Sequence, residues 1–334
     1  GLERVEKVEP DPLNLSVNTV VGSNILIKID NMFCVPYDGS AFYFIEGREV
    51  EKMKDKRIKY EIRQQILDAV NKVKLTNPMV GSITNSVTIN LVANTQLAVG
   101  GSAAMVYLAD EAETLANASG AFYINVGTLL PIYEQTLPHL VKVLYETRKP
   151  WVLDPVAIGI GSLRGRLLKE FKAYKPTVIR GNASEIIALA GLWQLDGGQA
   201  DSRVRGVDSR DDVSAAKTAA ISLASHTGGA VVVSGKVDLI TDGKLVANSH
   251  GGSHFMERIT GAGCSLGGVI GVYLANASPF IAALTASNIY NLAGRRAEKR
   301  VEGPASFQTS FIDELYKASP EDIANNPFEI EEVK

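Results

Sequence analysis

The sequence is poor in the residues that build disulfide-rich or metal-rich proteins. Its 334 residues include two cysteines, Cys34 and Cys264, and four histidines. Two cysteines exclude a scaffold held together by many disulfides, which is the usual design of small secreted domains. No Cys-x-x-Cys pair occurs, so the chain also offers little for a structural zinc site.

Charge of one sign and long apolar runs are also lacking. Lys and Arg number 34 and Asp and Glu number 37, which leaves a net charge of −3 and argues against a nucleic-acid binder. The most apolar stretch, 267–287, contains Asn276, Ser278 and Pro279, so it indicates two buried helices and not a membrane span. No signal-peptide pattern opens the printed sequence, and we expect a cytoplasmic protein with no nucleic-acid or membrane partner.

The first part of the chain differs from the rest. Residues 1–16 are charged and aperiodic, which is typical of a tail, whereas 24–30, 32–35 and 41–45 have the composition of strands, with a turn at 37–40. Apolar residues at helical spacing predict a helix over 54–74. We therefore expect an N-terminal tail and small β extension over 1–55, one large domain over 56–320, and a C-terminal tail over 321–334.

The large domain alternates between short β runs and amphipathic helices. This alternation predicts an α/β fold with a mostly parallel central sheet and helices on both faces. Residues 237–247, with a turn at Asp242-Gly243, predict an antiparallel hairpin at the edge of that sheet. The expected strands are 103–107, 121–125, 151–155, 177–179, 230–234, 237–241 and 245–247, and the expected helices are 84–98, 110–118, 132–148, 163–173, 183–192, 211–225, 263–275, 280–299 and 306–318.

Polar or glycine-rich residues follow the ends of the predicted strands. In parallel sheets, ligands bind in the crevice outside the carboxyl ends of the strands, so these segments are expected to form one site. The segments are Asn125–Thr128, Asp154–Val156, Arg180–Glu185, Ser234-Gly235 and Thr260–Ser265.

Thr260–Ser265 opens a long apolar helix and contains Gly261 and Gly263. Glycines permit a tight turn, and the first N–H groups of the helix then point at an anion, which indicates a phosphate cradle. The chain has no Walker lysine motif, and the glycine spacing does not match the dinucleotide fingerprint. The sequence alone leaves open a helix start whose glycines serve only close packing.

Arg180 follows a predicted strand, where its guanidinium can bind phosphate oxygens in a fork. Glu185 lies one turn into the next helix and can reach Mg²⁺ or its waters, but Asn182 or Ser184 can equally cap that helix, with Glu185 favoured by the helix dipole. Asp154 ends a buried strand, so its carboxylate is expected to serve an ion, a catalytic network or a neighbouring turn.

A larger set of motifs carries a resemblance. The chain is similar to the hydroxyethylthiazole kinase family over roughly residues 57–318, and the most specific matches are Asp154-Pro-Val, Arg180–Glu185, and Gly-Ala-Gly followed by Cys264. The full set is Ile83-Thr-Asn85 with Asn90, Ala93-Asn94, Leu97–Gly100, Asn125–Leu129, Leu153–Val156, Arg180–Glu185, Gly206–Ser209 and Thr260–Ser265.

The resemblance implies a ribokinase-like three-layer sandwich that phosphorylates 4-methyl-5-(2-hydroxyethyl)thiazole for thiamine synthesis or salvage, with ATP as co-substrate and Mg²⁺ as cofactor. It places Gly261, Ala262, Gly263 and Cys264 at the reacting hydroxyl. The resemblance further implies that Asn85, Val87, Met105, Gly127 and Gly261 bind the thiazole, that Arg180, Asn182 and Ser234 bind ATP, and that Asp154 and Glu185 organise the metal.

The resemblance also implies a homotrimer whose sites lie at subunit interfaces. The chain departs from the family at Gly81 and Ser86, where relatives often have His and Tyr, and Tyr107 replaces a smaller residue. These changes concern the outer wall of the thiazole pocket. The family usually has Thr at the position of Ser234, a change that keeps the hydroxyl.

Two other functions are compatible with the residues. One is a kinase of the same superfamily for another small alcohol, such as hydroxymethylpyrimidine, although Cys264 stands where that wider group usually has Asp. The other is a non-catalytic binding protein on the same fold, and the intact Arg180, Asp154 and Glu185 argue against it. A redox-sensing role for Cys264 is a third, narrower hypothesis.

Overall fold

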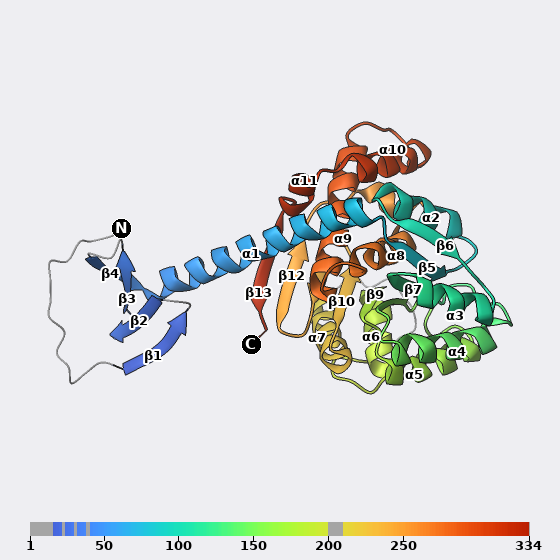
Figure 1. Ribbon diagram of the computed structural model, residues 1–334, viewed down its shortest axis with the longest axis horizontal. Helices are drawn as coiled ribbons and strands as arrows, with labels where there is room; N and C mark the ends of the chain where they lie inside the picture. The colour runs from blue at the N-terminus through green and yellow to red at the C-terminus, as the bar shows by residue number, and fades with distance from the viewer. Residues whose placement is uncertain (1–15, 22–23, 30–31, 38–40, 200–209, 334) are drawn as a thin grey trace. The chain divides into compact units, whose positions relative to one another are not determined.

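The structure is a computed structural model that describes the chain except for residues 1–15, 22–23, 30–31, 38–40, 200–209 and 334 (Figure 1). Most of the turn expected at 37–40 and all of the motif Gly206–Ser209 lie outside the described residues. The chain divides into two compact units, Gly1–Glu61 and Ile62–Lys334. The family-like motifs all belong to the second unit.

The first unit contains a four-stranded antiparallel sheet in the order β1-β2-β3-β4. Its strands are β1 (Ser16–Val21), β2 (Asn24–Ile29), β3 (Met32–Tyr37) and β4 (Ala41–Glu46). Strand β1 was not expected, because its Asn and Thr residues weaken the apolar alternation of a strand. Helix α1 (Gly47–Thr76) begins in this unit, ends in the second, and is longer than the helix predicted over 54–74.

The second unit contains a nine-stranded sheet in the order β13-β12-β11-β10-β9-β8-β7-β5-β6. The strands from β5 to β10 are parallel and the rest are antiparallel, which confirms a mostly parallel sheet. The bounds are β5 (Met79–Ile83), β6 (Ser102–Met105), β7 (Ala121–Asn125), β8 (Trp151–Asp154), β9 (Val178–Asn182), β10 (Ala230–Ser234), β11 (Asp238–Thr241), β12 (Leu245–Ser249) and β13 (Phe328–Glu332).

The sequence prediction missed strand β5, which lies between β6 and β7. Its five residues include Gly81 and Ser82, which give a weak strand signal. Gly81 is required by packing, because a Cβ there would lie 2.4 Å from the Phe122 ring. The following helix begins at Ile89 and not at residue 84, since the chain first leaves the sheet through the segment 84–88.

The C-terminal segment 321–334 was expected to be a tail, and this is wrong. It contributes most of helix α11 (Pro320–Ala324) and strand β13, which pairs antiparallel with β12. The predicted hairpin is present as β11 and β12. Strand β13 pairs with β12 and is the outermost strand, so the hairpin is not at the sheet edge. Strand β13 alternates Phe328 and Ile330 with Glu residues, a pattern too short and too acidic to be read as a strand.

Helices cover both faces of the large sheet and give three layers (Figure 1). Helices α2, α8, α9 and α10 pack together in one layer, and α3 to α7 form the other. Their bounds are α2 (Ile89–Ala98), α3 (Ala109–Ala118), α4 (Tyr133–Glu146), α5 (Ser162–Phe171), α6 (Ala183–Leu192), α7 (Arg210–Thr227), α8 (Ala262–Leu274), α9 (Pro279–Glu298) and α10 (Pro304–Lys317).

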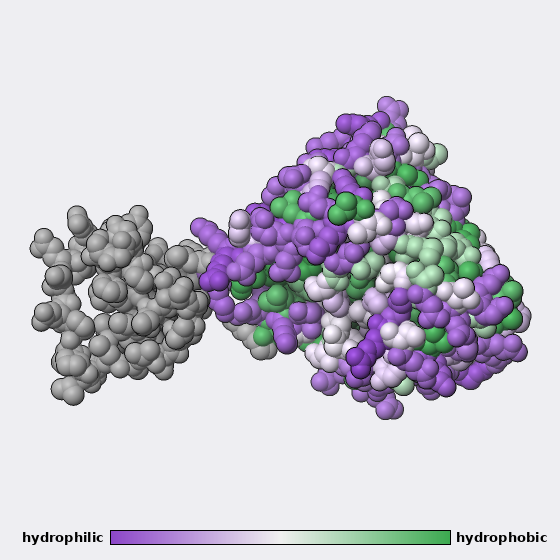
Figure 2. All heavy atoms as spheres, in the orientation of Figure 1, coloured by the Kyte–Doolittle hydropathy of each residue, from purple (hydrophilic) through white to green (hydrophobic). Residues whose placement is uncertain are grey.

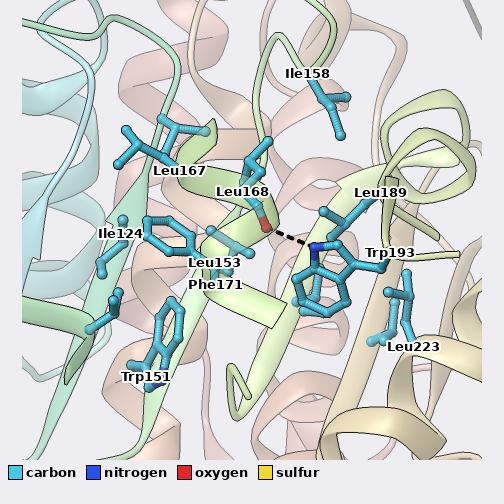
Figure 3. Close-up of a cluster of buried hydrophobic side chains, with 14 of the residues drawn as sticks. Ile124, Trp151, Leu153, Ile158, Leu167, Leu168, Phe171, Leu189, Trp193 and Leu223 are labelled. Carbon is cyan, nitrogen blue, oxygen red and sulfur yellow. Dashed lines mark hydrogen bonds between the residues drawn. The ribbon is translucent and has the colours of Figure 1, made fainter. Parts of the chain in front are cut away.

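A large apolar cluster fills the space between the sheet and the layer α3 to α7 (Figure 3). Trp151 packs edge-to-face on Phe171, and the Trp193 indole N–H donates to the Leu168 carbonyl at 2.7 Å. On the other face, every residue of α8 from Ser265 to Leu274 is buried, because α8 lies between the sheet and helices α2 and α9. This packing fixes the start of α8 against the strands.

The surface in view is mainly hydrophilic, with smaller apolar areas between the charged residues (Figure 2). Within the described part of the chain, none of the helices combines the length and the apolar character that crossing a bilayer requires. The predicted pair of helices over 267–287 corresponds to the end of α8 and the start of α9, which are separated by residues 275–278, with Ser278 as the N-cap and Pro279 as the first residue of α9.

Candidate active site

Four neighbouring parallel strands end in polar residues at one edge of the sheet. Asn125 ends β7 and Asp154 ends β8, and the register pairs them directly. Asn182 ends β9 and is paired with Ser234 at the end of β10. The strand ends that sequence reasoning singled out therefore lie side by side, as parallel strands require.

Asp154 and Arg180 form a buried ion pair at this edge. An Arg180 Nη lies 3.3 Å from Asp154 Oδ2, and both side chains are almost fully buried. Arg180 Nε also donates to the Ser234 hydroxyl at 3.0 Å. A buried ion pair is stable only when its remaining donors and acceptors are satisfied, and here the strand ends supply those partners.

Burial and the ion pair act in opposite directions on the pKa of each group. Burial raises the pKa of Asp154 to about 7, with Glu185 adding to the rise and Arg180 opposing it. Burial alone would lower the pKa of Arg180, but the carboxylates of Asp154 and Glu185 raise it above its ordinary value. Arg180 is therefore a permanent cation, whereas Asp154 can gain a proton near neutral pH.

The first turn of α8 lies directly against the Arg180 guanidinium. Gly261 is the N-cap in the left-handed region, with φ 92°, which favours glycine. A Cβ on Gly263 would lie 2.3 Å from an Arg180 Nη, so only glycine leaves room for the cation there. The start of a helix, whose first N–H groups are free, and a guanidinium thus lie side by side, an arrangement suited to an anion.

Tyr123 on β7 joins this cluster, and sequence reasoning did not identify it. Its hydroxyl lies 2.7 Å from the Cys264 carbonyl and 3.1 Å from Asp154 Oδ2, and it accepts a hydrogen bond from the Asn125 amide at 2.9 Å. Gly267 makes space for the ring, because a Cβ there would lie 2.6 Å from it. Since a phenol has one proton, it donates to one of the two oxygens at a time.

Cys264 is partly buried in the first turn of α8, and Asn85 Nδ2 lies 3.4 Å from its Sγ. Asn85 also donates to Asn125 Oδ1 at 3.1 Å. Burial and the nearby Asp154 raise the pKa of the Cys264 thiol, and Arg180 only partly opposes this. The thiol is therefore protonated at neutral pH, which makes it a poor proton acceptor.

Asn182 and Glu185 form a capping box at the start of α6. The Asn182 side chain accepts from the Glu185 N–H at 2.8 Å, and Glu185 Oε2 accepts from the Asn182 N–H at 2.9 Å. The helix-capping alternative is thus present in the structure. Glu185 is nevertheless buried and close enough to raise the pKa of Asp154, so capping and a role at the site are compatible.

The residues expected to bind the thiazole are not all brought together. The Gly127 N–H donates to Asn125 Oδ1 at 2.9 Å, and a Cβ on Gly127 would lie 3.1 Å from the Asn85 side chain, which places Gly127 beside Asn85. Val87, in the segment after β5, is 65% exposed. Met105 ends strand β6 and lines a separate surface hollow of about 450 Å³ with residues of α3.

Comparisons with known proteins agree with this geometry. The model of the hydroxyethylthiazole kinase family matches residues 70–321. The chain belongs to this family. A hydroxyethylthiazole kinase from Bifidobacterium longum (strain DJO10A) is 50% identical over 283 residues, which cover 79% of this chain and 90% of that protein. One from Cereibacter sphaeroides (strain ATCC 17023) is 44% identical over 244 residues, covering 73% of this chain and 90% of its own length.

Solved structures confirm the fold expected for the family. The hydroxyethylthiazole kinase protein from Pyrococcus horikoshii OT3 superposes with a TM-score of 0.70 at 29% identity, covering 80% of this chain and 99% of that one. A pyridoxal kinase from Staphylococcus aureus bound to ADP gives a TM-score of 0.51 at 18% identity, covering 77% and 99%, and shows the shared fold alone. The ribokinase-like three-layer sandwich is thereby confirmed.

A kinase of this family is expected to use Mg²⁺ with ATP, and the site can be tested for such an ion. In the described part of the chain, no three His, Cys, Asp or Glu side chains form a metal cluster. Mg²⁺ is commonly held by one or two carboxylates together with waters and substrate phosphates. Asp154 and Glu185 are both buried and electrostatically coupled, so they fit an ion held in that way.

Proposed function

We propose that this chain transfers the γ-phosphoryl group of ATP to the primary alcohol of 4-methyl-5-(2-hydroxyethyl)thiazole. The observation that carries the proposal is the Arg180 guanidinium, buried between Asp154 and the glycine-rich start of α8. Phosphoryl transfer depends mainly on positioning and charge stabilisation, because its transition state is loose. A fixed cation beside free helix N–H groups supplies that stabilisation.

Each residue of the cluster has a role in this proposal. Arg180, Asn182 and Ser234 bind the ATP phosphates, and the N–H groups of residues 261–264 face the transferring group. Asp154 and Glu185 would hold Mg²⁺, which would neutralise the triphosphate charge. Cys264 places the attacking hydroxyl and is at most a weak proton acceptor, since its raised pKa keeps the thiol protonated.

The thiazole side of the site is formed by Asn85, Gly127 and Gly261, with Met105 and Val87 supplied by a neighbouring subunit of a homotrimer. Two features support the trimer. Met105 lines a different hollow from the Cys264 cluster of its own chain. Exposed apolar side chains also follow four adjacent strands at the carboxyl edge, and such a concentration is typical of an interface. They are Val87, Leu108, Leu130 and Ile160.

Of the two departures at Gly81 and Ser86, the one at Ser86 bears on which thiazole is preferred. The Gly81 Cβ position is filled by Phe122, so this residue serves packing inside the sheet. The Ser86 N–H donates to the Thr128 hydroxyl at 3.1 Å, which ties the segment after β5 to the segment after β7. We propose a cytoplasmic enzyme of thiamine synthesis or salvage whose pocket wall is set by these two segments.

One assay tests the proposal. ADP release is measured with the thiazole alcohol, hydroxymethylpyrimidine, pyridoxal and ribose as acceptors, with and without Mg²⁺. We expect turnover with the thiazole alcohol, dependence on Mg²⁺, and a trimeric mass in light scattering. If hydroxymethylpyrimidine is the preferred acceptor, the thiazole alcohol is not the substrate and the chain is a kinase for another alcohol. ATP binding without turnover of any alcohol would favour a binding protein.

A further inference from the structure

Arg164, in the first turn of α5, is a buried arginine that none of the roles above uses. Its Nε donates to the Val126 carbonyl at 2.8 Å and one Nη donates to the Gly127 carbonyl at 2.8 Å. The other Nη donates to the Ile160 carbonyl. One guanidinium thus joins the segment after β7 to the segment after β8.

The partners of Arg164 are backbone carbonyls, and within the described residues it forms no ion pair with a carboxylate. Burial lowers the pKa of its guanidinium, as expected when a cation is desolvated without a counter-charge. Burying a cation there without a counter-charge costs free energy of folding. The planar fork of arginine holds donors on three separate nitrogens at fixed positions, whereas lysine has its three donors on one nitrogen and glutamine has only two donors.

The segment that Arg164 holds continues directly into the catalytic cluster. The Gly127 N–H donates to Asn125 Oδ1, and the same oxygen accepts from Asn85 Nδ2. Asn85 Nδ2 also lies 3.4 Å from Cys264 Sγ. A shift of Gly127 would remove one of the two donors that orient the Asn125 amide, and the Asn85 contact to Cys264 would change with it.

The segment after β8 needs such support because its backbone is unusual. Ala157 has φ 61°, and Gly159 and Gly161 have φ 91° and 75°. An alanine in the left-handed region persists only where its surroundings hold it. The buried Ile158 side chain and the bond from Arg164 to the Ile160 carbonyl provide that hold.

We propose that Arg164 is a positioning residue for the phosphate acceptor, which fixes Gly127 against Asn125 and Asn85 so that the alcohol side of the site is preformed. The proposal rests on the proposed function in one respect, because it assumes that Gly127 faces the acceptor. It assigns Arg164 an effect on the acceptor and none on ATP, whose partners Arg180 and Ser234 belong to other strands.

The test is chemical rescue of Arg164→Ala by free guanidinium. We expect the variant to raise KM for the thiazole alcohol about tenfold or more, the equivalent of one or two lost hydrogen bonds from a charged group, with KM for ATP unchanged. Guanidinium, well below denaturing concentrations, fills the vacated space and lowers the acceptor KM again. The matched control is Arg166→Ala, which removes an exposed arginine from the same helix as Arg164; its partner is Glu134 of α4.

Further measurements make the outcome decisive. Arg164→Lys keeps the charge but loses the fork, so it should raise the acceptor KM as well; wild-type kinetics in this variant would refute the proposal. Amide hydrogen exchange at residues 126–128 is expected to speed up in Arg164→Ala and to slow again with guanidinium. Guanidinium that restores the melting temperature but not the acceptor KM would reduce Arg164 to a structural role.

The same measurements separate this proposal from the proposed function. If the wild type does not phosphorylate the thiazole alcohol, the proposed function fails, while the exchange experiment still tests the Arg164 contacts without any substrate. If the wild type is active and Arg164→Ala keeps its acceptor KM, the positioning role fails and the proposed function stands.

Discussion

Two buried carboxylates lie at the same edge of the large sheet, Asp154 and Asp238. Asp154 ends the parallel strand β8, and Asp238 begins the antiparallel strand β11, whose start therefore lies beside the end of β10. Both side chains are buried, and burial raises the pKa of each, to about 7 for Asp154 and about 6 for Asp238.

Their partners differ in charge. Asp154 faces Arg180 and the hydroxyl of Tyr123. Asp238 accepts from the Gly235 N–H at 3.0 Å and from the Asn291 amide at 3.0 Å. Beyond Asn291, this second cluster continues through neutral side chains on β12, on α9 and in the segment before β13, which are Ser249, Asn288 and Asn326.

The difference shows how one sheet edge serves two purposes. The cluster around Asp154 keeps a cation aimed at the start of α8, where an anionic ligand can use it. The cluster around Asp238 consists of amides and hydroxyls that satisfy one another and join α9 to the antiparallel strands. We therefore expect changes in the first cluster to alter kinetics and changes in the second to alter stability.

The largest effect is expected from Arg180→Met. Hydrogen bonds from a charged group contribute about 1.5–3 kcal/mol each, so kcat/KM for ATP should fall about a hundredfold or more. The variant also leaves Asp154 buried without its cation, which costs about 3–5 kcal/mol of unfolding free energy. Steady-state kinetics and denaturant unfolding measure both effects.

The double variant Asp154→Asn with Arg180→Met separates these two effects. It removes the unpaired charge, so we expect part of the stability to return while activity stays low. Unchanged ATP kinetics in Arg180→Met would show that Arg180 does not bind the ATP phosphates. The proposed difference between the cluster around Asp154 and the cluster around Asp238 would then be wrong.

Gly263→Ala is expected to have the next largest effect. The added Cβ would lie 2.3 Å from an Arg180 Nη, so the guanidinium must move. Small misplacements of a catalytic group cost up to about 10²-fold in rate, and we expect a loss of tenfold or more. The control is Gly165→Ala in α5, where a Cβ meets no atom within 4 Å. That change should leave kinetics alone and add about 0.5–1 kcal/mol of stability.

Substitutions at Cys264 should have smaller effects. They test how charge acts in the cluster around Asp154 and Arg180. Cys264→Asp should keep at least wild-type kcat, because an ionised carboxylate accepts the alcohol proton better than a protonated thiol. Its KM for ATP should rise, since the new charge lies near Asp154 and the triphosphate.

Cys264→Ser should be slower than wild type, and Cys264→Ala should retain residual activity from the anion-binding helix start. The competing mechanism is a phospho-cysteine intermediate. It predicts that all three variants are inactive and that mass spectrometry detects a phosphorylated enzyme.

The smallest effect on activity is expected from Asp238→Asn. This variant should instead change how the free energy of unfolding depends on pH. The folded-state pKa of Asp238 lies above the ordinary value, so the unfolded chain loses this proton first as pH rises. Unfolding free energy should therefore decline between about pH 4 and pH 6, by up to about 3 kcal/mol. The variant should flatten this decline, as measured by denaturant unfolding across that range, with kcat unchanged. A large loss of kcat would place Asp238 in the active site.

Local sequence pattern determined the alternation of strands and helices and the polar residues at the strand ends. The sequence alone assigns four polar residues to one edge of the sheet, because parallel strands bring their carboxyl ends together. They are Asn125, Asp154, Arg180 and Ser234. The anion-binding start of α8 could also be predicted from the sequence, since a glycine N-cap and free helix N–H groups are local features.

Only the tertiary structure decided which side chains meet across the sequence. Tyr123 and Arg164 gave no local signal, because an apolar strand and a helix start readily contain a tyrosine or an arginine. Strand β13 is too short and too acidic to be recognised without β12 as its partner. Gly263 and Arg180 are 83 positions apart in the chain, and the need for glycine exists only because the fold presses one against the other.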